Sequence, residues 1–372
     1  MAKATRVKPE AILILTVIPV MAELAIVVYL FRAGCRAEEF PGYHSTGRSA
    51  AFWSETYGGP AIQPLTTASY AFLANPPKDF SDRGFLIPRG SLHIGTAESE
   101  GDAAAMLADF ADSPVRLEKI EADEIDRHLS GRRNGWDVAL WEPDCCDIDV
   151  AGLHQAYLRA ASAHGCKPLC RARVRSLSHR DGCWLIETEA GLYEATTIVN
   201  AAGAWADTIA KMAGLQPLSI QPYRRTVVQL QVSPAASADL PLVVGLDGSF
   251  YFKPEAGGRL WLSPHDEIET PPCDAAPEEL DVAMAIARFE EVVDWKIERL
   301  ERKWAGLRSF APDRKPVIGR DGAVDSFFWL AGQGGFGIQT APAVAKLAGD
   351  LLLERKTDPD LPINQYDPSR FA

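Results

Sequence analysis

Four glycines near the C-terminal end, Gly332, Gly334, Gly335 and Gly337, make a loop with almost no Cβ atoms directly before an apolar helical segment. The backbone amides of such a loop, together with the N-terminus of the helix that follows, can hold an anion or a carbonyl oxygen. The run of small residues at 201–203 allows an equally close approach to the backbone. Both runs indicate cofactor contacts, with ordinary strand-to-helix turns as the alternative.

Arg308 stands in an otherwise apolar and aromatic stretch that includes Trp304 and Phe310. A guanidinium group is the natural bidentate partner of a carboxylate, so we expect Arg308 to bind a substrate carboxylate, with a surface ion pair as the alternative. Arg224 and Arg225 are neighbours on one predicted strand and therefore point to opposite faces. We expect Arg224 to line the pocket.

Two kinds of structure, βα units and an antiparallel sheet, are predicted to position these residues. A short buried strand at 197–200, a tight turn and a helix at 205–212 form one βα unit, and the chain ends with a strand, the glycine loop and a helix. Between these units, four short strand-like runs separated by turn residues indicate an antiparallel sheet, and 118–128 reads as a surface helix. The pattern predicts an α/β fold in which a Rossmann-like nucleotide-binding domain is interrupted by an antiparallel-sheet substrate domain.

Composition supports two domains, because 372 residues with 47% hydrophobic side chains are too many for one ordinary core. The net charge of -12 gives no electrostatic reason to bind nucleic acid, so an anionic substrate must meet local Arg or Lys side chains. The seven cysteines show no CxxC spacing, which indicates buried thiols in a reducing cytosol and no metal site. The expected nucleotide-binding domain comprises 1–80, 145–220 and 305–372, and the substrate domain 81–144 and 221–304.

The segment at 11–31 is apolar except for Glu23 and follows three basic residues. Its length suits a signal anchor or a transmembrane helix. Pro19 and Glu23 near its middle favour instead a buried strand that runs into a buried helix. We expect a cytoplasmic protein, with membrane association through this segment as the alternative.

Three segments together point to a family: PGYHSTGRSAAFWSETYG at 41–58, IVNAAGAWADTIA at 198–210, and WAGLRSFAPDRKPVIG followed by WLAGQGGFGIQTAPAVAKLAGDLL within 304–352. In order and spacing they resemble the D-amino-acid oxidase superfamily of FAD-dependent oxidoreductases. Within it they look most like the bacterial catabolic D-arginine, or broad D-amino-acid, dehydrogenases. The resemblance runs from about Glu38 to the C-terminal helix.

The resemblance implies FAD as cofactor and oxidation of the CH–NH2 bond of a D-amino acid to an imine, then to a 2-oxo acid and ammonia. Electrons would pass to a quinone, oxygen or another acceptor. Arg308 and Tyr251 would hold the substrate carboxylate, the Gly332 carbonyl the amine, and Tyr57 would close over the substrate. The resemblance places at the FAD site His44, Ser45, Thr46, Arg48, Ser49, Val174, Ala202, Gly203, Trp205, Gly334, Gly335, Phe336, Gly337, Ile338 and Gln339. His44 is expected to orient cofactor and lid rather than to act as a base.

Two departures bear on the substrate. Ser91 stands where the D-arginine dehydrogenases carry a carboxylate for a basic side chain, and Phe52 stands where the family has a histidine. A neutral group cannot pair with a guanidinium. The sequence therefore indicates apolar D-amino acids or secondary amines, and a glycine or sarcosine oxidase-like activity is the alternative.

A third departure concerns the cofactor. The family opens with a GxGxxG turn that binds the pyrophosphate and a strand ending in an acid that binds the ribose. Here the glycine positions fall on Ile14, Thr16 and Pro19 and the acid on Arg36, although the length of the segment matches. A frameshifted reading, a degenerate paralogue that binds FAD poorly and a membrane anchor compete as explanations. A protein without catalytic activity, a remnant with defective FAD binding, is therefore the alternative to an enzyme.

Overall fold

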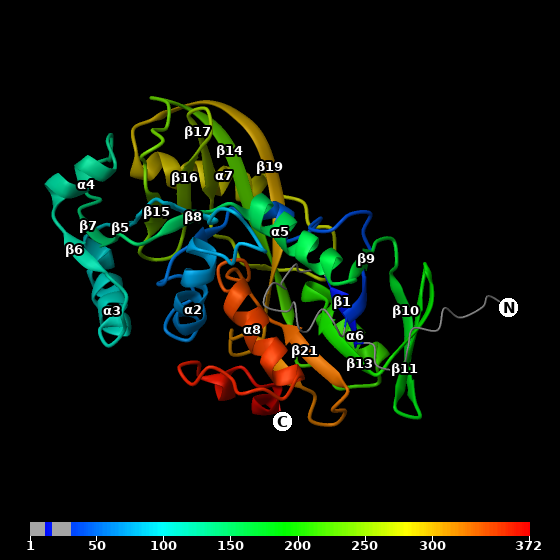
Figure 1. The fold of residues 1–372 in the computed structure, drawn as a ribbon. Helices are drawn as coiled ribbons and strands as arrows, with labels where there is room; N and C mark the ends of the chain where they lie inside the picture. The colour runs from blue at the N-terminus through cyan, green and yellow to red at the C-terminus, as the bar shows by residue number, and fades with distance from the viewer. Residues whose placement is uncertain (1–11, 17–30) are drawn as a thin grey trace.

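The computed structural model describes residues 12–16 and 31–372, whose strands form two large sheets and two small ones. Figure 1 shows the six-stranded sheet in the lower right of the view and the nine-stranded sheet above it. The mixed α/β fold expected from the sequence is confirmed. The sequence-based domain boundaries stay a prediction, and one strand, β19 (Lys296–Phe310), crosses the boundary expected at 305.

The six-stranded sheet is parallel apart from one edge strand. Its order is β20 (Val317–Arg320), β21 (Phe327–Ala331), β13 (Thr197–Ala201), β1 (Ile12–Thr16), β2 (Phe31–Cys35) and β9 (Lys167–Leu169). Only β20 runs antiparallel to its neighbour. Runs such as FFWLA in β21 are apolar throughout because strands of a parallel sheet are covered on both faces.

Helices cover this sheet and carry the segments of the site. α8 (Ala341–Leu352) packs against α2 (Gln63–Ala74) and β20, and its small residues allow a close approach. α6 (Ala206–Met212) follows β13, and α5 (Val150–Ala163) begins at Asp149, whose carboxylate accepts a hydrogen bond from the Gly152 amide and so caps the helix. A meander of β10 (Val174–Arg180), β11 (Cys183–Thr188) and β12 (Gly191–Ala195) completes this half.

The apolar N-terminal segment contributes to the centre of the six-stranded sheet, because β1 lies between β13 and β2. Pro19 and Glu23 lie outside the described residues. No helix in the described part of the chain has the length and apolarity needed to cross a bilayer. The seven cysteines are free thiols, and four of them are buried.

The nine-stranded sheet is built on two long antiparallel strands, β14 (Gln221–Ser233) and β19. Its remaining strands are β18 (Ile268–Glu269), β17 (Arg259–Ser263), β16 (Tyr251–Glu255), β15 (Leu242–Gly245), β5 (Ser91–Gly95), β7 (Val138–Glu142) and β6 (Glu118–Ile120). The helix expected over 118–128 is wrong in its first turn, because Glu118–Ile120 pairs with β7 as a strand and α4 spans only Ala122–His128. α3 (Glu100–Phe110) packs against β7, and a short 3-10 helix at Ala97–Ser99 precedes it.

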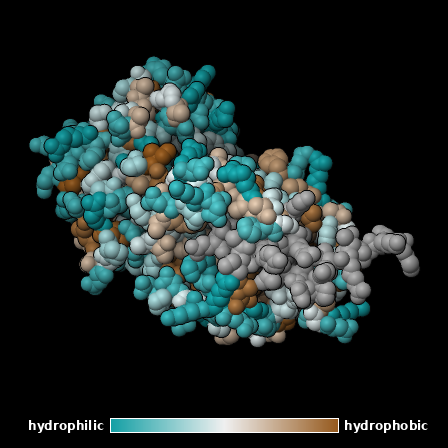
Figure 2. Space-filling model, viewed as in Figure 1, coloured by the Kyte–Doolittle hydropathy of each residue, from teal (hydrophilic) through white to brown (hydrophobic). Residues whose placement is uncertain are grey.

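The two faces of the nine-stranded sheet have different roles. One face packs on α7 (Glu279–Val292) and buries Val228, Leu230 and Phe252 in an apolar core. The opposite face looks toward the loop at 44–57, and a small sheet of β3 (Phe52–Trp53), β8 (Cys146–Ile148) and β4 (Leu86–Pro88) lies beside it. The outer surface is mainly hydrophilic, with hydrophobic side chains in separate small groups on the face that Figure 2 shows.

Candidate active site

The glycine loop follows β21 and leads into α8, as the sequence predicted. Gly334 has a φ of +51°, and its amide donates to the Ser309 carbonyl at 2.9 Å. A Cβ atom on Gly335 would lie 2.2 Å from the Tyr57 hydroxyl oxygen. Glycine is therefore required at both positions, at Gly334 by the left-handed backbone and at Gly335 by the tyrosine that packs over it.

A cavity opens between this loop, the loop at 44–49 and the end of β19. Its lining brings together most of the residues expected under the flavin ring. They are Ser45, Thr46, Ser49, Gly203, Leu307, Arg308, Ser309, Gln333, Gly334, Gly335, Gly337 and Ile338. The side-chain amide of Gln333 is buried there without a hydrogen-bond partner among the described residues. Gly332 begins the loop and does not line this described cavity.

A second cavity of about 270 Å³ lies at the ends of β2 and β13. It brings together Val174, Ala202 and Trp205, which the sequence predicted at the FAD site. Glu38 also lines it, and the sequence did not predict this carboxylate, because Arg36 stands at the position where the family has its acid. The only signal was an acid close to the end of the second strand.

Two other residues predicted to contact the cofactor, His44 and Arg48, line neither cavity and instead hold the loop at 44–49 in place. His44 accepts or donates a 3.0 Å hydrogen bond to Glu38 and packs on the Trp205 ring at 5.0 Å. Arg48 donates to the carbonyls of Ala275 and Ala305 at 2.9 and 3.0 Å, so it ties the loop to the nine-stranded sheet. Whether either side chain contacts FAD stays a prediction.

The turn that carries Tyr57 is held from two sides. Gln339, at the end of the glycine loop, accepts from the Ser54 amide at 3.3 Å and donates to the Tyr57 carbonyl at 3.1 Å. Phe336, next to it in the loop, packs edge-on against the Tyr57 ring at 6.1 Å. These contacts fix the turn to the start of α8.

From the other side, Glu142 of β7 accepts hydrogen bonds from the Ser54 hydroxyl at 2.9 Å and the Thr56 hydroxyl at 2.7 Å. His93 lies 3.2 Å from the same carboxylate. Burial raises the pKa of the Glu142 carboxyl, but these hydrogen bonds and the charge of His93 outweigh it and leave the pKa below its ordinary value. Sequence reasoning missed Glu142, because nothing local marks a contact across 86 residues.

Beyond the glycine loop, Arg308 lies buried against the cavity with no ion-pair partner among the described residues, and its Nε atom has no acceptor there. Tyr251 is buried beside it. Burial raises the pKa of the Tyr251 hydroxyl, opposed by the charges of Arg308 and Arg225. The strand register places both side chains on the same face of the nine-stranded sheet, and their joint role at a carboxylate stays a prediction.

The prediction that Arg224 lines the pocket is wrong. Its guanidinium pairs with Glu278 and, at 2.8 Å, with Asp281, both on the side of the sheet covered by α7. Arg225 points to the opposite face. It donates to the Asp266 carbonyl at 2.7 Å, and its Nη1 atom lies buried without a partner among the described residues.

His265 also belongs to the pocket, and no sequence signal marked it. Its ring lies 5.7 Å from Tyr251 and 6.2 Å from Tyr57, measured between centroids. Burial, with the charge of Arg225, lowers its pKa to about 3, so the imidazole is neutral. Its Nδ1 atom lies 2.5 Å from the Gly248 carbonyl, which only accepts, so Nδ1 carries the proton. The Nε2 atom is then an acceptor, and it has no partner among the described residues.

Aromatic side chains close the space around these polar groups. Phe52 packs edge-on against Tyr57 at 5.1 Å and against Tyr251 at 6.0 Å. Ser91, the other sequence departure, is buried in β5. The pocket therefore combines a buried guanidinium, a tyrosine hydroxyl and a neutral imidazole acceptor with apolar walls.

Comparison with known proteins agrees with this geometry. Residues 27–351 match the model of the family described as FAD dependent oxidoreductase (DAO). Mitochondrial dimethylglycine dehydrogenase of Homo sapiens is 32% identical over 257 residues, which cover 63% of this chain and only 29% of that protein. Glycine oxidase of Bacillus subtilis is 28% identical over 68% of this chain and 66% of its own. The solved L-proline dehydrogenase from P. horikoshii superposes with a TM-score of 0.83 at 22% identity, covering 98% of both chains.

Proposed function

Because the chain belongs to the FAD dependent oxidoreductase family, we propose that it oxidises the C–N bond of a D-amino acid with a neutral side chain. The product is an imine, which water hydrolyses to a 2-oxo acid and ammonia. The observation that carries this proposal is the buried Arg308 guanidinium, which has no carboxylate partner among the described residues. A buried charge is costly unless it is paired, and a substrate carboxylate supplies the missing partner.

FAD is the cofactor, and the described residues fit it at both ends. The glycine loop, the loop at 45–49 and the unpartnered Gln333 amide would hold the ring, and the cavity lined by Val174, Ala202 and Trp205 would hold the adenosine. When bound, FAD supplies the two-electron oxidising power that no side chain has. The fit at the pyrophosphate differs from the family pattern, because Ile14 and Thr16 of β1 stand at two glycine positions.

The pocket orients the substrate through three groups. Arg308 and the Tyr251 hydroxyl hold the carboxylate, so that the Cα–N bond faces the glycine loop. His265 contributes an acceptor, because its neutral Nε2 atom can take a hydrogen bond from the substrate amine. The amine must be neutral to be oxidised, so that its lone pair can form the C=N bond as the Cα hydrogen leaves.

The walls select the side chain. Phe52 and Tyr57 offer apolar surface, and Ser91 offers no charge at the position where a carboxylate would bind a basic group. We therefore assign small or apolar D-amino acids rather than D-arginine. Glycine or N-methylated glycine is the second candidate, because dimethylglycine dehydrogenase and glycine oxidase are among the relatives and such substrates carry the same carboxylate and amine.

The visible absorption spectrum of the FAD-loaded protein tests the proposal under anaerobic conditions. We expect bleaching after addition of D-alanine, D-valine or D-phenylalanine, and none after D-arginine or the L-enantiomers. Bleaching by sarcosine or dimethylglycine alone would replace the first assignment with the second. A yellow protein that no amine bleaches would refute both.

A further inference from the structure

One face of the nine-stranded sheet carries the substrate pocket at one end and an open groove at the other. Tyr251 pairs with Ser263, and Lys253 pairs with Trp261, so the alternation of strand side chains puts Lys253 and Trp261 on the same face as Tyr251. Gln229 of β14 is the partner of Trp261 and continues this face outward. The groove is thus the outer extension of the surface that binds the substrate.

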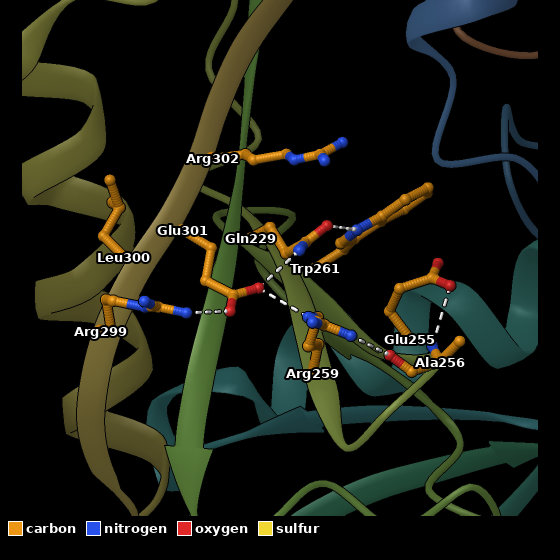
Figure 3. A pocket seen from close by; sticks show the side chains of 9 residues that line it. All are labelled: Gln229, Glu255, Ala256, Arg259, Trp261, Arg299, Leu300, Glu301 and Arg302. Atoms are coloured by element: carbon orange, nitrogen blue, oxygen red, sulfur yellow. Dashed lines mark hydrogen bonds and ion pairs between the residues drawn. The ribbon is translucent and has the colours of Figure 1, made fainter.

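The groove consists of two adjoining cavities of about 640 and 650 Å³, which share Glu255, Ala256 and Trp261. Each falls in the size range of small-molecule sites. Figure 3 shows the outer cavity, where Gln229, Arg259 and Arg299 all donate to the carboxylate of Glu301.

The third arginine of the outer cavity, Arg302, does not bind Glu301. Arg302 extends past the Trp261 ring in Figure 3, and no interaction is drawn to it. None of the ion pairs among the described residues includes its guanidinium, whereas Arg259 and Arg299 both pair with Glu301. The bulge in β19 opposite Gln229 and Leu230 lets the consecutive residues Glu301 and Arg302 both line the cavity.

The inner cavity combines small apolar residues with charged side chains of both signs. Arg89 and Lys253 both bind the carboxylate of Asp147, and Asp149 and Glu255 also line this cavity. The Lys253 ammonium, which is 6% exposed as a residue, lies 5.8 Å from the centroid of the Trp261 ring. In the register of the sheet, Trp261 pairs with Lys253 on one side and with Gln229 on the other, and Gln229 pairs with Arg302. An indole with a cation on either side suits a planar ring that carries electron-rich oxygens.

The groove also reaches the flavin cavity. Ser49 lines both the inner cavity of the groove and the cavity beneath the glycine loop. Trp261 packs edge-on against Trp304 at 5.4 Å, and the Trp304 indole nitrogen donates to the Arg48 carbonyl at 3.1 Å.

We propose that this groove binds the electron acceptor of the enzyme, a small quinone. The inference rests on the proposed function, because oxidation of one amine to an imine releases two electrons and two protons. Reduction of a quinone to a hydroquinone takes up the same number, converting two C=O groups to two C–OH groups. Negative charge develops on the quinone oxygens during reduction, and Lys253 and Arg302 are placed to stabilise it.

The test separates reoxidation from substrate oxidation. The full-length, FAD-loaded protein is reduced anaerobically with light and EDTA, so no amine is needed. It is then mixed with a short-chain ubiquinone analogue, and the return of flavin absorbance is followed by stopped flow. We expect a rate that saturates with quinone concentration.

Two variants and one control locate the site. Arg302→Gln removes a cation that has no described partner, so the fold is retained, and we expect the half-saturating quinone concentration to rise about ten-fold, as for loss of a charge-assisted hydrogen bond. Trp261→Leu should slow the saturated rate. The control is Lys296→Gln, which removes an exposed cation of β19 outside the groove and should change neither value.

Calorimetric titration of the oxidised protein with the same quinone gives a second readout that needs no turnover. Equal binding by wild type and Arg302→Gln, or reoxidation that rises linearly with quinone in every variant, would overturn the proposal. If quinone reoxidises the flavin but no amine bleaches it, the proposed amine oxidation is wrong and the quinone site in the groove stands. If an amine bleaches the flavin but quinone does not reoxidise it, the quinone site is wrong and the proposed amine oxidation stands.

Discussion

Replacing Arg308 by alanine removes the only described guanidinium of the pocket that has no partner of its own. The side chain is 8% exposed and lies beside Tyr251, among apolar walls. A substrate carboxylate in the variant would be desolvated without its bidentate partner, a loss of about 2–5 kcal/mol. At about 1.4 kcal/mol per ten-fold change, the apparent KM should rise roughly 30-fold to several thousand-fold.

The assay is anaerobic flavin reduction as a function of substrate concentration, with FAD content equalised between proteins. Arg224→Ala is the matched control, because Arg224 is the neighbouring arginine and its ion pairs with Glu278 and Asp281 lie on the opposite face of the sheet. We expect this control to lower stability and leave KM unchanged. An unchanged KM in flavin-loaded Arg308→Ala, or an equal rise in both variants, would remove Arg308 from the carboxylate site.

Three further predictions concern the cofactor, pH and the lid. Ile14→Gly with Thr16→Gly should tighten FAD binding about 30-fold if each restored backbone contact is worth about 1 kcal/mol, as a fluorescence titration with FAD would measure; no gain would mean that these positions do not meet the pyrophosphate. The His265 pKa is lowered to about 3 in the fold, so the unfolded chain binds the extra proton first and stability is lost as the pH falls from about 6.5 toward 3. By pH 5 this loss is about 2 kcal/mol, and chemical denaturation of His265→Gln should lack it; an identical pH profile would contradict the buried neutral imidazole. Gly335→Ala should lower flavin content, because the new Cβ would meet the Tyr57 hydroxyl at 2.2 Å, and Tyr57→Phe in the same chain should restore part of it; a second change without effect would show that the clash is not the cause.

The glycine loop and Arg308 could be predicted from sequence because each has a local cause. Gly334 needs a left-handed backbone, Gly335 needs the absence of a Cβ, and an arginine among aromatic residues needs an anionic partner. The sequence also contains enough information to predict which face of β14 each arginine occupies. Val228 and Leu230 occupy the even face that packs on α7, so the odd-numbered Arg225 had to face the other way.

His265 and Glu142 could not be predicted, because their roles arise from packing between distant segments. His265 becomes an acceptor only when the turn after β17 brings its Nδ1 atom to the Gly248 carbonyl. Glu142 acts on the Tyr57 turn across 86 residues of chain. Periodicity and composition contain no information on such contacts, whereas the strand order of the nine-stranded sheet fixes both.

The loop at 44–57 couples the two halves of the active site. Its first part lines the flavin cavity, while Arg48 donates to the Ala305 carbonyl of β19 and its own carbonyl accepts from Trp304. Its last part is fixed between Glu142 of the nine-stranded sheet and Gln339 before α8. The polar groups proposed to hold the substrate, Arg308, Tyr251 and His265, by contrast belong to the nine-stranded sheet and the turn after β17. The altered fingerprint at β1 therefore bears on how tightly FAD would bind, whereas the loop at 44–57 and the Gly334–Ser309 backbone bond set how the flavin cavity and the nine-stranded sheet are aligned.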